Sequence, residues 1–430
     1  MLKWMAVLVG LAVAAPAAAA PAAAAPVAWV ELTPQGAEAR AIVDGAGCPT
    51  LRADGKAIAM RTRAAPGEAF PNRVCAARLP RRARRLVVAG SALRAPIARP
   101  NRLVIFGDSG CRIVKGLVQN CNDPVAGWPF AQVARLAAAQ HPDLVIHLGD
   151  YYYREAPCPP ATEACAGSPY GDRWATWKAE LFDPARPLLA AAPWVFVRGN
   201  HEDCARGGAG WFRLVDPLPP LIKGTACATS EETWFAPIGG IRLAIFDDAE
   251  ADDNKSDPGA EASASKGILP VLDSREPTTW LVTHRPLWAL SHKGLSIGGD
   301  WGNVNVREAV KAWFATPGVD VSWSHVSLML AGHVHNFTSL DFAGARPPEL
   351  IVGTGGDVQD PRDPHRPLQL SLPVDGVTAN AITTGEFGYF VFDRIGADWV
   401  GAFHDLDDQV TIRCRLHAAR LACVPVAPKS

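Results

Sequence analysis

The stretch LVIHLGDYYY at residues 144–153 joins an apolar run to a glycine, an aspartate and three consecutive tyrosines. A short run that is apolar almost throughout is typical of a strand covered on both faces. Six more such runs end in a polar or glycine-rich turn: LVIFGD at 103–108, WVFVRGN at 194–200, IRLAIFDD at 241–248, WLVTH at 280–284, VSLMLAGH at 326–333 and ELIVGTGG at 349–356. Helical patterns at 129–140 and 306–315 lie between some of them, so the sequence predicts an α/β fold.

Polar residues stand at the carboxyl ends of five of these predicted strands: Asp108, Asp150, Asn200, His284 and His333. Because α/β sheets bind ligands at the carboxyl ends of their strands, we expect these side chains to meet at one rim. Together with His201 and His335, they form an oxygen and imidazole donor set that suits first-row metal ions. The set exceeds what one tetrahedral ion needs. Two ions about 3.5–4 Å apart are the recurrent arrangement for phosphoryl hydrolysis.

In two of these motifs, strand geometry does not decide which side chains bind a metal. His333 and His335 in GHVH would point the same way on an extended segment, although a turn past the strand end can aim them at two ions. Strand alternation does not distinguish Tyr151, Tyr152 and Tyr153, because the chain leaves its strand before them.

Five motifs in order carry a resemblance: GDSG at 107–110, GDYYY at 149–153, GNHE at 199–202, VTHRP at 282–286 and GHVH at 332–335. They resemble the calcineurin-like metallophosphoesterase superfamily and, within it, the purple acid phosphatases. The likeness covers residues 100–395 and includes IVGTGG at 351–356 and TTGEFGYFVFD at 383–393. It departs at Gly110, where many relatives carry a histidine, and at Leu281, where the family has valine. Asn336 and Phe337 follow GHVH where relatives often have an aromatic-rich continuation.

The resemblance implies a fold and a set of roles. The fold is an α/β (α+β) sandwich of two mixed β-sheets flanked by helices. The GDxxY spacing selects Tyr153 and leaves Tyr151 and Tyr152 to packing or a pocket wall. One ion, Fe(III), is then held by Asp108, Asp150, Tyr153 and His335. The second ion, Fe(II), Zn(II) or Mn(II), is held by Asp150, Asn200, His284 and His333, with Asp150 bridging. His201 binds the substrate phosphate and protonates the leaving oxygen.

This assignment predicts hydrolysis of phosphate monoesters by a metal-activated hydroxide, at acidic to neutral pH. A phenolate is a hard anionic donor that suits a trivalent ion, and such an ion acidifies bound water. Three alternatives use the same residues: a phosphodiesterase or nucleotidase, a non-catalytic phosphate-binding or adhesive module, and a structural single-zinc protein. His201 argues against the last two, because a merely structural metal site has no use for a proton donor.

Composition limits the partners. Lys+Arg 42 against Asp+Glu 43 gives a net charge of -1, so no long-range field recruits nucleic acid or an anionic membrane. We interpret the basic run LPRRARR at 79–85 as a solvated face and expect a small phosphorylated substrate. Nothing in the composition selects an oligomeric state.

The N-terminus predicts a signal peptide over residues 1–25, with Lys3 before an apolar core at 4–13 and small residues at 17–25. A retained membrane anchor is disfavoured, because the apolar run is shorter than about 20 residues and prolines interrupt its continuation. We therefore expect export to the periplasm or secretion. Residues 26–98 form short alternating runs that predict a small β domain. A stiff linker at 95–100 leads into a catalytic domain at 99–430.

Ten cysteines in an exported chain predict disulfides. The shortest loops pair Cys48 with Cys75, Cys111 with Cys121, Cys158 with Cys165, Cys204 with Cys227 and Cys414 with Cys423. A metal-ligand or nucleophile role for Cys111 or Cys204 is the less favoured alternative. We interpret His147 as a buried core histidine. Asp247 and Asp248 either orient metal ligands or begin a solvated loop.

Overall fold

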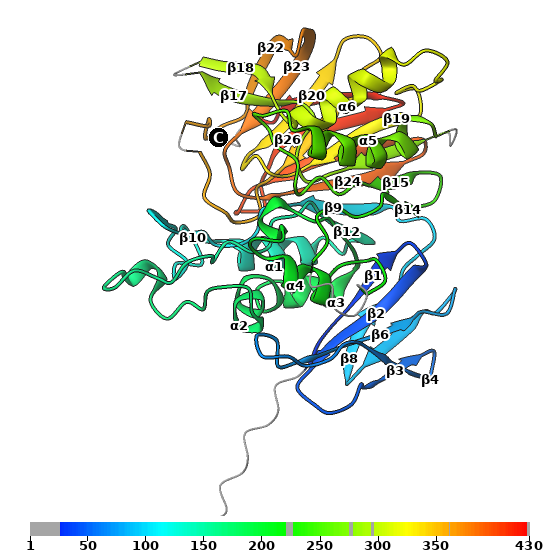
Figure 1. Cartoon of the computed structure of the whole chain (residues 1–430), viewed down its shortest axis with the longest axis vertical. Coiled ribbons are helices and arrows are strands. Elements are labelled where there is room, and N and C mark those ends of the chain that lie inside the picture. Colours follow the sequence, from blue (N-terminus) through cyan, green and yellow to red (C-terminus); the bar gives the residue numbers. More distant parts are fainter. Residues whose placement is uncertain (1–25, 221–226, 275–277, 294–295, 361, 428–430) are drawn as a thin grey trace, which may run out of the picture.

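The computed structural model describes residues 26–220, 227–274, 278–293, 296–360 and 362–427. The predicted signal peptide at 1–25 lies outside these residues. Two large mixed sheets form the body of the molecule (Figure 1), which confirms the predicted sandwich. Among the described residues, none of the helices combines the length and apolar character that crossing a membrane requires.

The first sheet has 11 strands, and its central strands are parallel. In spatial order they are β27 (Arg420–Pro425), β26 (Val410–His417), β25 (Asp398–His404), β24 (Tyr389–Ile395), β9 (Arg102–Phe106), β12 (Leu144–His147), β13 (Pro193–Phe196), β1 (Val27–Thr33), β2 (Gly36–Val43), β6 (Arg73–Arg78) and β5 (Arg61–Ala64). The continuous apolar runs at 103–106, 144–147 and 194–196 thus lie side by side at its centre, as predicted.

The second sheet has 10 strands, with four parallel neighbours that carry the other apolar runs. In order they are β14 (Trp234–Pro237), β15 (Arg242–Ile245), β16 (Thr279–Val282), β19 (Val326–Ala331), β21 (Glu349–Val352), β20 (Phe337–Phe342), β23 (Val377–Thr384), β22 (Leu368–Val374), β18 (Ser296–Trp301) and β17 (Ala289–Lys293). A separate pair, β10 (Ile113–Val114) and β11 (Leu117–Val118), lies in the loop after β9.

Aromatic side chains fill the space between the two sheets. Trp280 of β16 packs against Phe392 of β24 and Trp399 of β25, with ring centroids 5.7 and 5.2 Å apart. Phe337 of β20 lies 5.7 Å from Phe390 of β24. All five side chains are buried. Large rings therefore hold the sheets face to face, which brings the ends of their parallel strands together.

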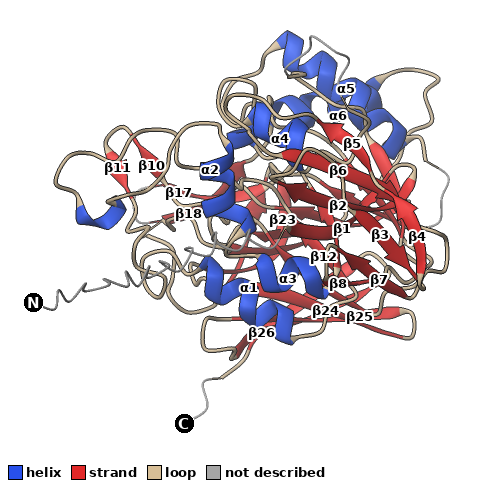
Figure 2. Cartoon of the chain, turned by 90° about the horizontal axis from the view of Figure 1, so that it is seen from below, coloured by secondary structure: helices blue, strands red, loops and turns tan. Residues whose placement is uncertain are grey.

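Helices cover the outer faces of the sandwich (Figure 2). The α-helices are α1 (Phe130–Ala139), α2 (Trp174–Trp177), α3 (Arg186–Ala191), α4 (Gly208–Leu214), α5 (Pro258–Leu272) and α6 (Val304–Ala315). Helix α1 packs its buried apolar side chains into the core of the first sheet, and α5 and α6 pack theirs on the second. Both helices predicted from the sequence, at 129–140 and 306–315, are confirmed.

The N-terminal β region, β1 to β8, precedes the catalytic region as predicted, and it is joined to it by hydrogen bonds. Strand β1 pairs in parallel with β13, so β1, β2, β6 and β5 extend the first sheet. The remaining strands form a four-stranded sheet: β4 (Lys56–Ala59), β3 (Thr50–Ala53), β7 (Arg85–Val88) and β8 (Ser91–Arg94). The division at residue 98 stays a prediction.

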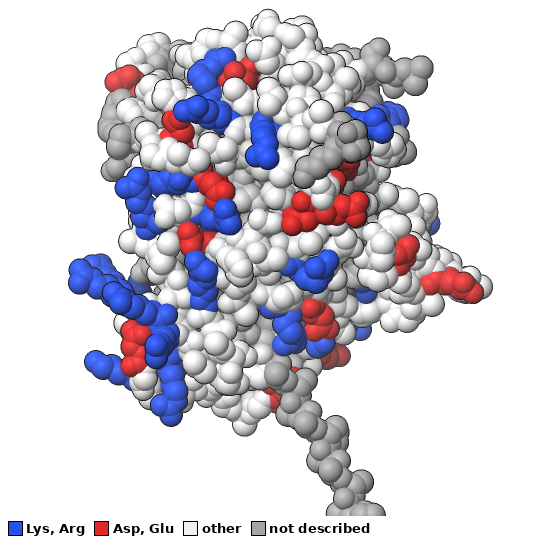
Figure 3. Space-filling model, turned by 180° about the vertical axis from the view of Figure 1, so that it is seen from behind, with Lys and Arg blue, Asp and Glu red and all other residues white. Residues whose placement is uncertain are grey.

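Basic side chains gather on this N-terminal region, at the lower left of Figure 3. Residues 26–98 contain twelve Lys and Arg against five Asp and Glu, although the whole chain has a net charge of -1. The basic surface belongs to the β region and not to the strand ends described below. Attraction of a phosphate to those strand ends must therefore come from groups at the ends themselves.

All five predicted disulfides are present. Cys111 and Cys204 each follow a motif of interest and are bonded to Cys121 and Cys227. Neither is therefore a thiolate ligand or a nucleophile. The Cys111–Cys121 disulfide closes a segment after β9, and the Cys204–Cys227 disulfide closes one after β13.

Candidate metal centre

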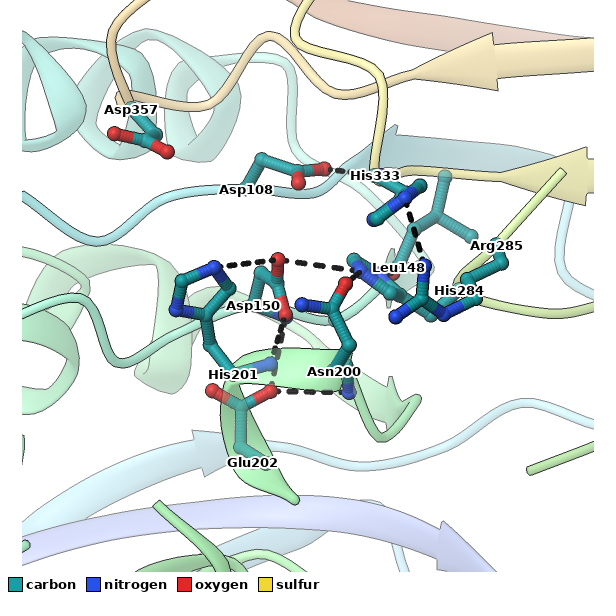
Figure 4. A network of polar contacts seen from close by, with 12 residues as sticks. Asp108, Leu148, Asp150, Asn200, His201, Glu202, His284, Arg285, His333 and Asp357 are labelled. Carbon is teal, nitrogen blue, oxygen red and sulfur yellow. Dashed lines mark hydrogen bonds and ion pairs between the residues drawn. The ribbon is translucent and has the colours of Figure 1, made fainter. Parts of the chain in front are cut away.

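The polar residues predicted from the sequence follow the ends of strands and lie close together. Figure 4 shows Asp108, Asp150, Asn200, His201, His284 and His333 among them. Asp108 follows β9, Asp150 and Tyr153 follow β12, and Asn200 and His201 lie in the short 3-10 helix Asn200–Glu202 after β13. His284 follows β16, and His333 and His335 follow β19. The expected single rim is thus present, but strands of two sheets contribute to it. The sequence pattern did not show this division, because runs of both sheets look alike.

Tyr153 points its hydroxyl into this cluster. The oxygen lies 2.7 Å from Asp150 Oδ2, 3.2 Å from Asp108 Oδ1 and 3.1 Å from His335 Nε2. The Nε2 atom of His335 is 3.4 Å from Asp108 Oδ1. Two carboxylates, a phenol and an imidazole therefore converge on one point, and these are the four residues assigned to the first ion.

Its two neighbours take other roles, as the GDxxY spacing predicted. The hydroxyl of Tyr151 donates to the carbonyl of Val197 at 2.9 Å, and its ring stacks on buried His147 at 4.1 Å. Tyr152 stacks on Trp177 with centroids 6.3 Å apart. Both tyrosines are buried packing residues, and His147 is the predicted core histidine.

The other side of Asp150 faces an amide and two imidazoles. His284 Nε2 lies 3.0 Å from Asn200 Oδ1 and 3.2 Å from Asp150 Oδ2. The ring of His333 is 5.1 Å from that of His284. Asp150, His284 and His333 each offer one ligand atom, and these atoms all lie within 4.8 Å of one another. The carboxylate of Asp150 thus separates two groups of donors.

Three of these residues have a left-handed backbone: φ is 57° at Asp108, 59° at Asp150 and 68° at His333. This conformation costs a residue with a side chain of the order of 1–2 kcal/mol. Each residue lies two or three positions after the end of a strand, where the unusual turn re-aims its side chain. Strained backbone gathered at one place is typical of functional sites.

The donor chemistry fits metal ions. His284 donates from Nδ1 to the carbonyl of Leu148 at 2.7 Å, and His335 donates from Nδ1 to that of Val358 at 2.7 Å. In its neutral form each ring then presents the lone pair of Nε2 to the cluster. At His284 this lone pair faces Asn200 Oδ1, which also only accepts hydrogen bonds. Two such acceptors in contact take up either a proton or a metal ion, and the same pattern of backbone-anchored histidines is typical of metal ligands.

The electrostatics of the cluster also favour cations. Burial opposes protonation of His284, but Asp150 and other carboxylates overcome it and raise its pKa to about 10. Burial likewise opposes protonation of His335, while Asp357 and Asp108 raise its pKa to about 9. At His333, burial and then Arg285 lower the pKa to about 4, so this ring is a neutral donor. The centre holds a negative potential that bound cations would neutralise.

Two buried glutamates hold the GDYYY loop in place. Glu202 accepts hydrogen bonds from the backbone N–H groups of Asp150, Tyr151 and Tyr152, at 2.8–3.0 Å. Glu180 accepts one from the N–H of Tyr153 at 3.0 Å. The loop conformation that presents Asp150 and Tyr153 is therefore fixed by two buried carboxylates that bind its backbone.

A family model described as calcineurin-like phosphoesterase matches residues 102–337, which contain every residue of the cluster. The chain belongs to this family. The match confirms the resemblance drawn from the five motifs, and it identifies the protein as a phosphoesterase. No curated protein matches the chain.

Solved structures share the fold of this calcineurin-like phosphoesterase. One is the purple acid phosphatase PPD1 from yellow lupin (Lupinus luteus) seeds, at 13% identity and a TM-score of 0.51, covering 93% of this chain and 74% of that one. Another is PhoD, at 12% identity and a TM-score of 0.55, covering 96% and 94%. At these identities the likeness concerns the fold alone.

One departure from the family pattern has a steric explanation. A Cβ atom at Gly110 would lie 2.6 Å from Cδ2 of Tyr153 and 2.8 Å from the carbonyl oxygen of Tyr151. A histidine at 110 is therefore incompatible with Tyr153 in its present position. The missing histidine of the first motif and the tyrosine of the second are two parts of one arrangement.

His201 lies at the edge of the cluster. Its backbone N–H donates to Asp150 Oδ1 at 2.8 Å, and its ring packs on that of Tyr153 with centroids 4.0 Å apart. Nδ1 is 2.5 Å from Glu155 Oε1, and Nε2 is 4.0 Å from Asp150 Oδ2. Glu155 thus orients the ring so that Nε2 faces the centre. Sequence reasoning missed Glu155, although it stands two residues after Tyr153.

Sequence reasoning also missed two acidic residues that contact the histidines. Asp357 Oδ2 lies 3.3 Å from His335 Nε2, and Arg112 binds this carboxylate. Asp253 Oδ2 lies 2.7 Å from His333 Nε2. Asp357 directly follows IVGTGG, which was a usable signal. Asp253 lies in the acidic stretch 250–257, where composition suggested a solvated loop.

Asp248 resolves the alternative posed for the acidic pair at the end of β15. Its Oδ1 atom accepts hydrogen bonds from the backbone N–H groups of His284 at 3.1 Å and Arg285 at 3.2 Å. Asp247 instead pairs with Arg198 at 3.1 Å. Asp248 therefore orients the candidate ligand His284. Asp247 binds Arg198, which lies just after β13 of the first sheet.

Proposed function

We propose that this phosphoesterase is an exported phosphatase that hydrolyses phosphate monoesters at a binuclear metal centre. The observation that carries the proposal is the convergence of Tyr153, Asp108 and His335 on one side of Asp150 and of Asn200 and His284 on the other. Export is supported by the five disulfides, since such bonds persist in oxidising compartments.

The residues divide into two ligand sets that share one carboxylate. Asp108, Asp150, Tyr153 and His335 would hold Fe(III), because a phenolate and two carboxylates are hard anionic donors. Asp150, Asn200, His284 and His333 would hold Fe(II), Zn(II) or Mn(II). When bound, the two ions supply a nucleophile from water and neutralise charge on the phosphoryl oxygens.

The chain itself supplies the proton for the leaving group. His201 has Glu155 at Nδ1, so Nε2 is the nitrogen that faces the centre. Arg206 lies 3.8 Å from the same carboxylate and donates to the carbonyl of Asn200, which ties the position of Glu155 to a ligand loop. We assign to His201 the binding of a phosphoryl oxygen and the donation of the Nε2 proton to the departing alkoxide.

The substrate preference is tested with matched aryl esters. We expect kcat/KM for 4-nitrophenyl phosphate to exceed that for bis(4-nitrophenyl) phosphate by at least about tenfold, a difference of about 1.4 kcal/mol in transition-state binding. A much larger kcat/KM for the diester would replace the monoesterase with a phosphodiesterase on the same residues.

The role of His201 is tested by His201→Ala, with metal content measured beside activity. We expect kcat to fall by about 10²–10⁴, the usual contribution of a general acid. The metal content should stay at the wild-type value, because His201 is not assigned as a ligand. His417→Ala is the control, since His417 is exposed on β26. Unchanged activity in His201→Ala would refute the assigned mechanism.

A further inference from the structure

A cavity of about 600 Å³ opens beside the candidate centre. Its volume falls within the range of about 300–1,000 Å³ that is usual for small-molecule sites. His333 and His335 line both the cavity and the centre, so the two spaces adjoin. The apolar side chains of its lining are Leu290, Ile297, Trp301 and Val334. Its polar side chains include Asn336, Asp360, Arg362, Asp363 and Thr383.

Trp301 belongs to the apolar lining of the cavity and also contacts a residue of the centre. Its ring stacks on the imidazole of His333, with centroids 5.7 Å apart and planes inclined by only 9°. It also packs, with Val334, against the small buried cluster around Ile351. Trp301 is only half-buried, so part of it faces the cavity. The indole of Trp301 thus stacks directly on a candidate metal ligand. The part of it that faces the cavity can contact a flat apolar group.

The charge of the lining argues against a second anionic group. Asp360 and Asp363 both line the cavity, and its one guanidinium, Arg362, is bound to Asp360. Asp363 accepts a hydrogen bond from Asn336 Nδ2 at 3.2 Å. A further phosphate placed here would meet two carboxylates and a guanidinium that is already paired. The cavity therefore suits an uncharged group.

We propose that this cavity binds the alcohol part of the substrate, and that this part is an uncharged group containing a flat ring, of the aryl or nucleoside class. Trp301 and Ile297 contact the ring. The inference rests on the proposed phosphatase function and specifies its substrate class. It predicts a preference for esters of ring-containing alcohols. The metals and His201 do not produce this preference, because they act on the phosphoryl group and the leaving oxygen alone.

The test compares 2-phenylethyl phosphate with ethyl phosphate, two esters of primary alcohols with similarly basic leaving groups. We expect wild-type kcat/KM to be at least about tenfold higher for the phenylethyl ester. Trp301→Ala and Ile297→Asn should each lower this ratio towards one, and Trp301→Phe should retain most of it. Phe314→Ala is the matched control, because Phe314 is an exposed aromatic residue on α6 outside the cavity, and it should keep the wild-type ratio.

Binding of non-hydrolysable analogues separates this inference from the proposed function. We expect 2-phenylethylphosphonate to bind at least tenfold more tightly than ethylphosphonate, and this advantage should disappear in Trp301→Ala. If both esters are hydrolysed at equal rates and both phosphonates bind equally, the inference is overturned while the phosphatase function stands. If neither ester is hydrolysed, the proposed function fails, and the phosphonate affinities alone decide whether the cavity is a ring site.

A nucleoside ester distinguishes the two ring classes. Adenosine 5′-monophosphate is also an ester of a primary alcohol, so it enters the same comparison. A kcat/KM above that of 2-phenylethyl phosphate indicates a nucleoside site, and a lower value indicates an aryl site. Adenosine 5′-diphosphate should bind at least tenfold more weakly than the monophosphate, and tighter binding would contradict the charge argument.

Discussion

Two clusters of buried charged side chains among the described residues can be compared, because they are neutralised in different ways. The first is the Glu31–Arg40 cluster, formed by Glu31, Arg40, Arg63 and Asp216. Arg40 lies 2.7 Å from Glu31, and Arg63 lies 3.2 Å from Asp216. Burial raises the pKa of Glu31 to about 8, although Arg40 opposes this, so a proton can also neutralise it.

At the candidate centre the nearest arginines are bound to other carboxylates. Arg112 pairs with Asp357, and Arg285 pairs with Asp253. Asp108 and Asp150 are as deeply buried as Glu31, but among the described residues the side chains in contact with them are imidazoles and a phenol.

The difference separates a structural cluster from a functional one. A buried charge is costly unless it is paired, so a cluster neutralised from within stabilises only the fold. A cluster in which carboxylates, a phenol and imidazoles converge on one point without a guanidinium instead takes up cations from outside, either protons on its imidazoles or metal ions. Equal burial of acidic residues in two places therefore does not mean equal function. The position of the arginines distinguishes the structural cluster from the functional one.

The largest expected effect comes from removing the shared carboxylate of the centre. Asp150→Asn should lower kcat/KM by at least about a thousandfold, because metal-assisted charge stabilisation contributes several kcal/mol. The metal-free variant should unfold at a lower temperature than the metal-free wild type, because Asp150 pairs with His284 and accepts a hydrogen bond from the N–H of His201. Steady-state kinetics and thermal unfolding measure both. Asp183→Asn, at an exposed site, is the control. Retained activity would show that the cluster does not hold the reacting metals.

Removing the phenol should have a spectroscopic effect. Fe(III) bound to a tyrosinate gives a visible absorption band, so Tyr153→Phe should abolish the colour of the iron-loaded protein. Tyr151→Phe and Tyr152→Phe should keep it, because their hydroxyls lie outside the cluster. Absorption spectra of the three variants compare them directly. A band that survives in Tyr153→Phe would remove Tyr153 from the ligand set.

The Glu31–Arg40 cluster should show the opposite pattern. Arg40→Met leaves Glu31 buried beside no guanidinium and should lower the free energy of unfolding by about 3–5 kcal/mol. The kcat per folded molecule should stay at the wild-type value, because Glu31, Arg40 and Arg63 lie in the N-terminal β region and not at the strand ends that carry the candidate ligands. Denaturant unfolding and kinetics at a temperature where both proteins are folded provide the comparison. A large fall in kcat would show that this cluster acts on the centre.

The smallest expected effect is a pH dependence of the same cluster. The folded pKa of Glu31, about 8, exceeds its ordinary value of 4.5, so its contribution to stability is complete below 4.5 and is lost as pH rises through 8. Glu31→Gln does not titrate. The stability of the wild type relative to this variant should therefore fall between pH 5 and pH 9, by at least about 1 kcal/mol. Parallel stability curves would contradict the raised pKa.

Much of this molecule was predictable from its sequence because the information is local. The apolar runs at 103–106, 144–147 and 326–331 form strands where predicted, and a motif at the end of each run carries the candidate ligands. The distinction among three tyrosines also came from spacing, through the family pattern. Short loops between cysteines likewise predicted all five disulfides.

Other features depend on contacts between distant segments that have no local pattern. The pairing of β1 with β13 spans more than 150 residues, so the N-terminal β region was expected as a separate unit. Asp253 and Asp357 act on His333 and His335 from loops, and loop residues carry no periodic signal. The clash that links Gly110 to Tyr153 is visible only once both loops are placed in space.

The most direct test of a two-metal centre is anomalous X-ray scattering from a crystal of the purified protein. Two peaks are predicted, one on each side of Asp150. The peak beside Tyr153 and His335 should show the absorption edge of iron, and the other should lie beside Asn200 and His284. A single peak, or no peak between these side chains in an active protein, would contradict the account.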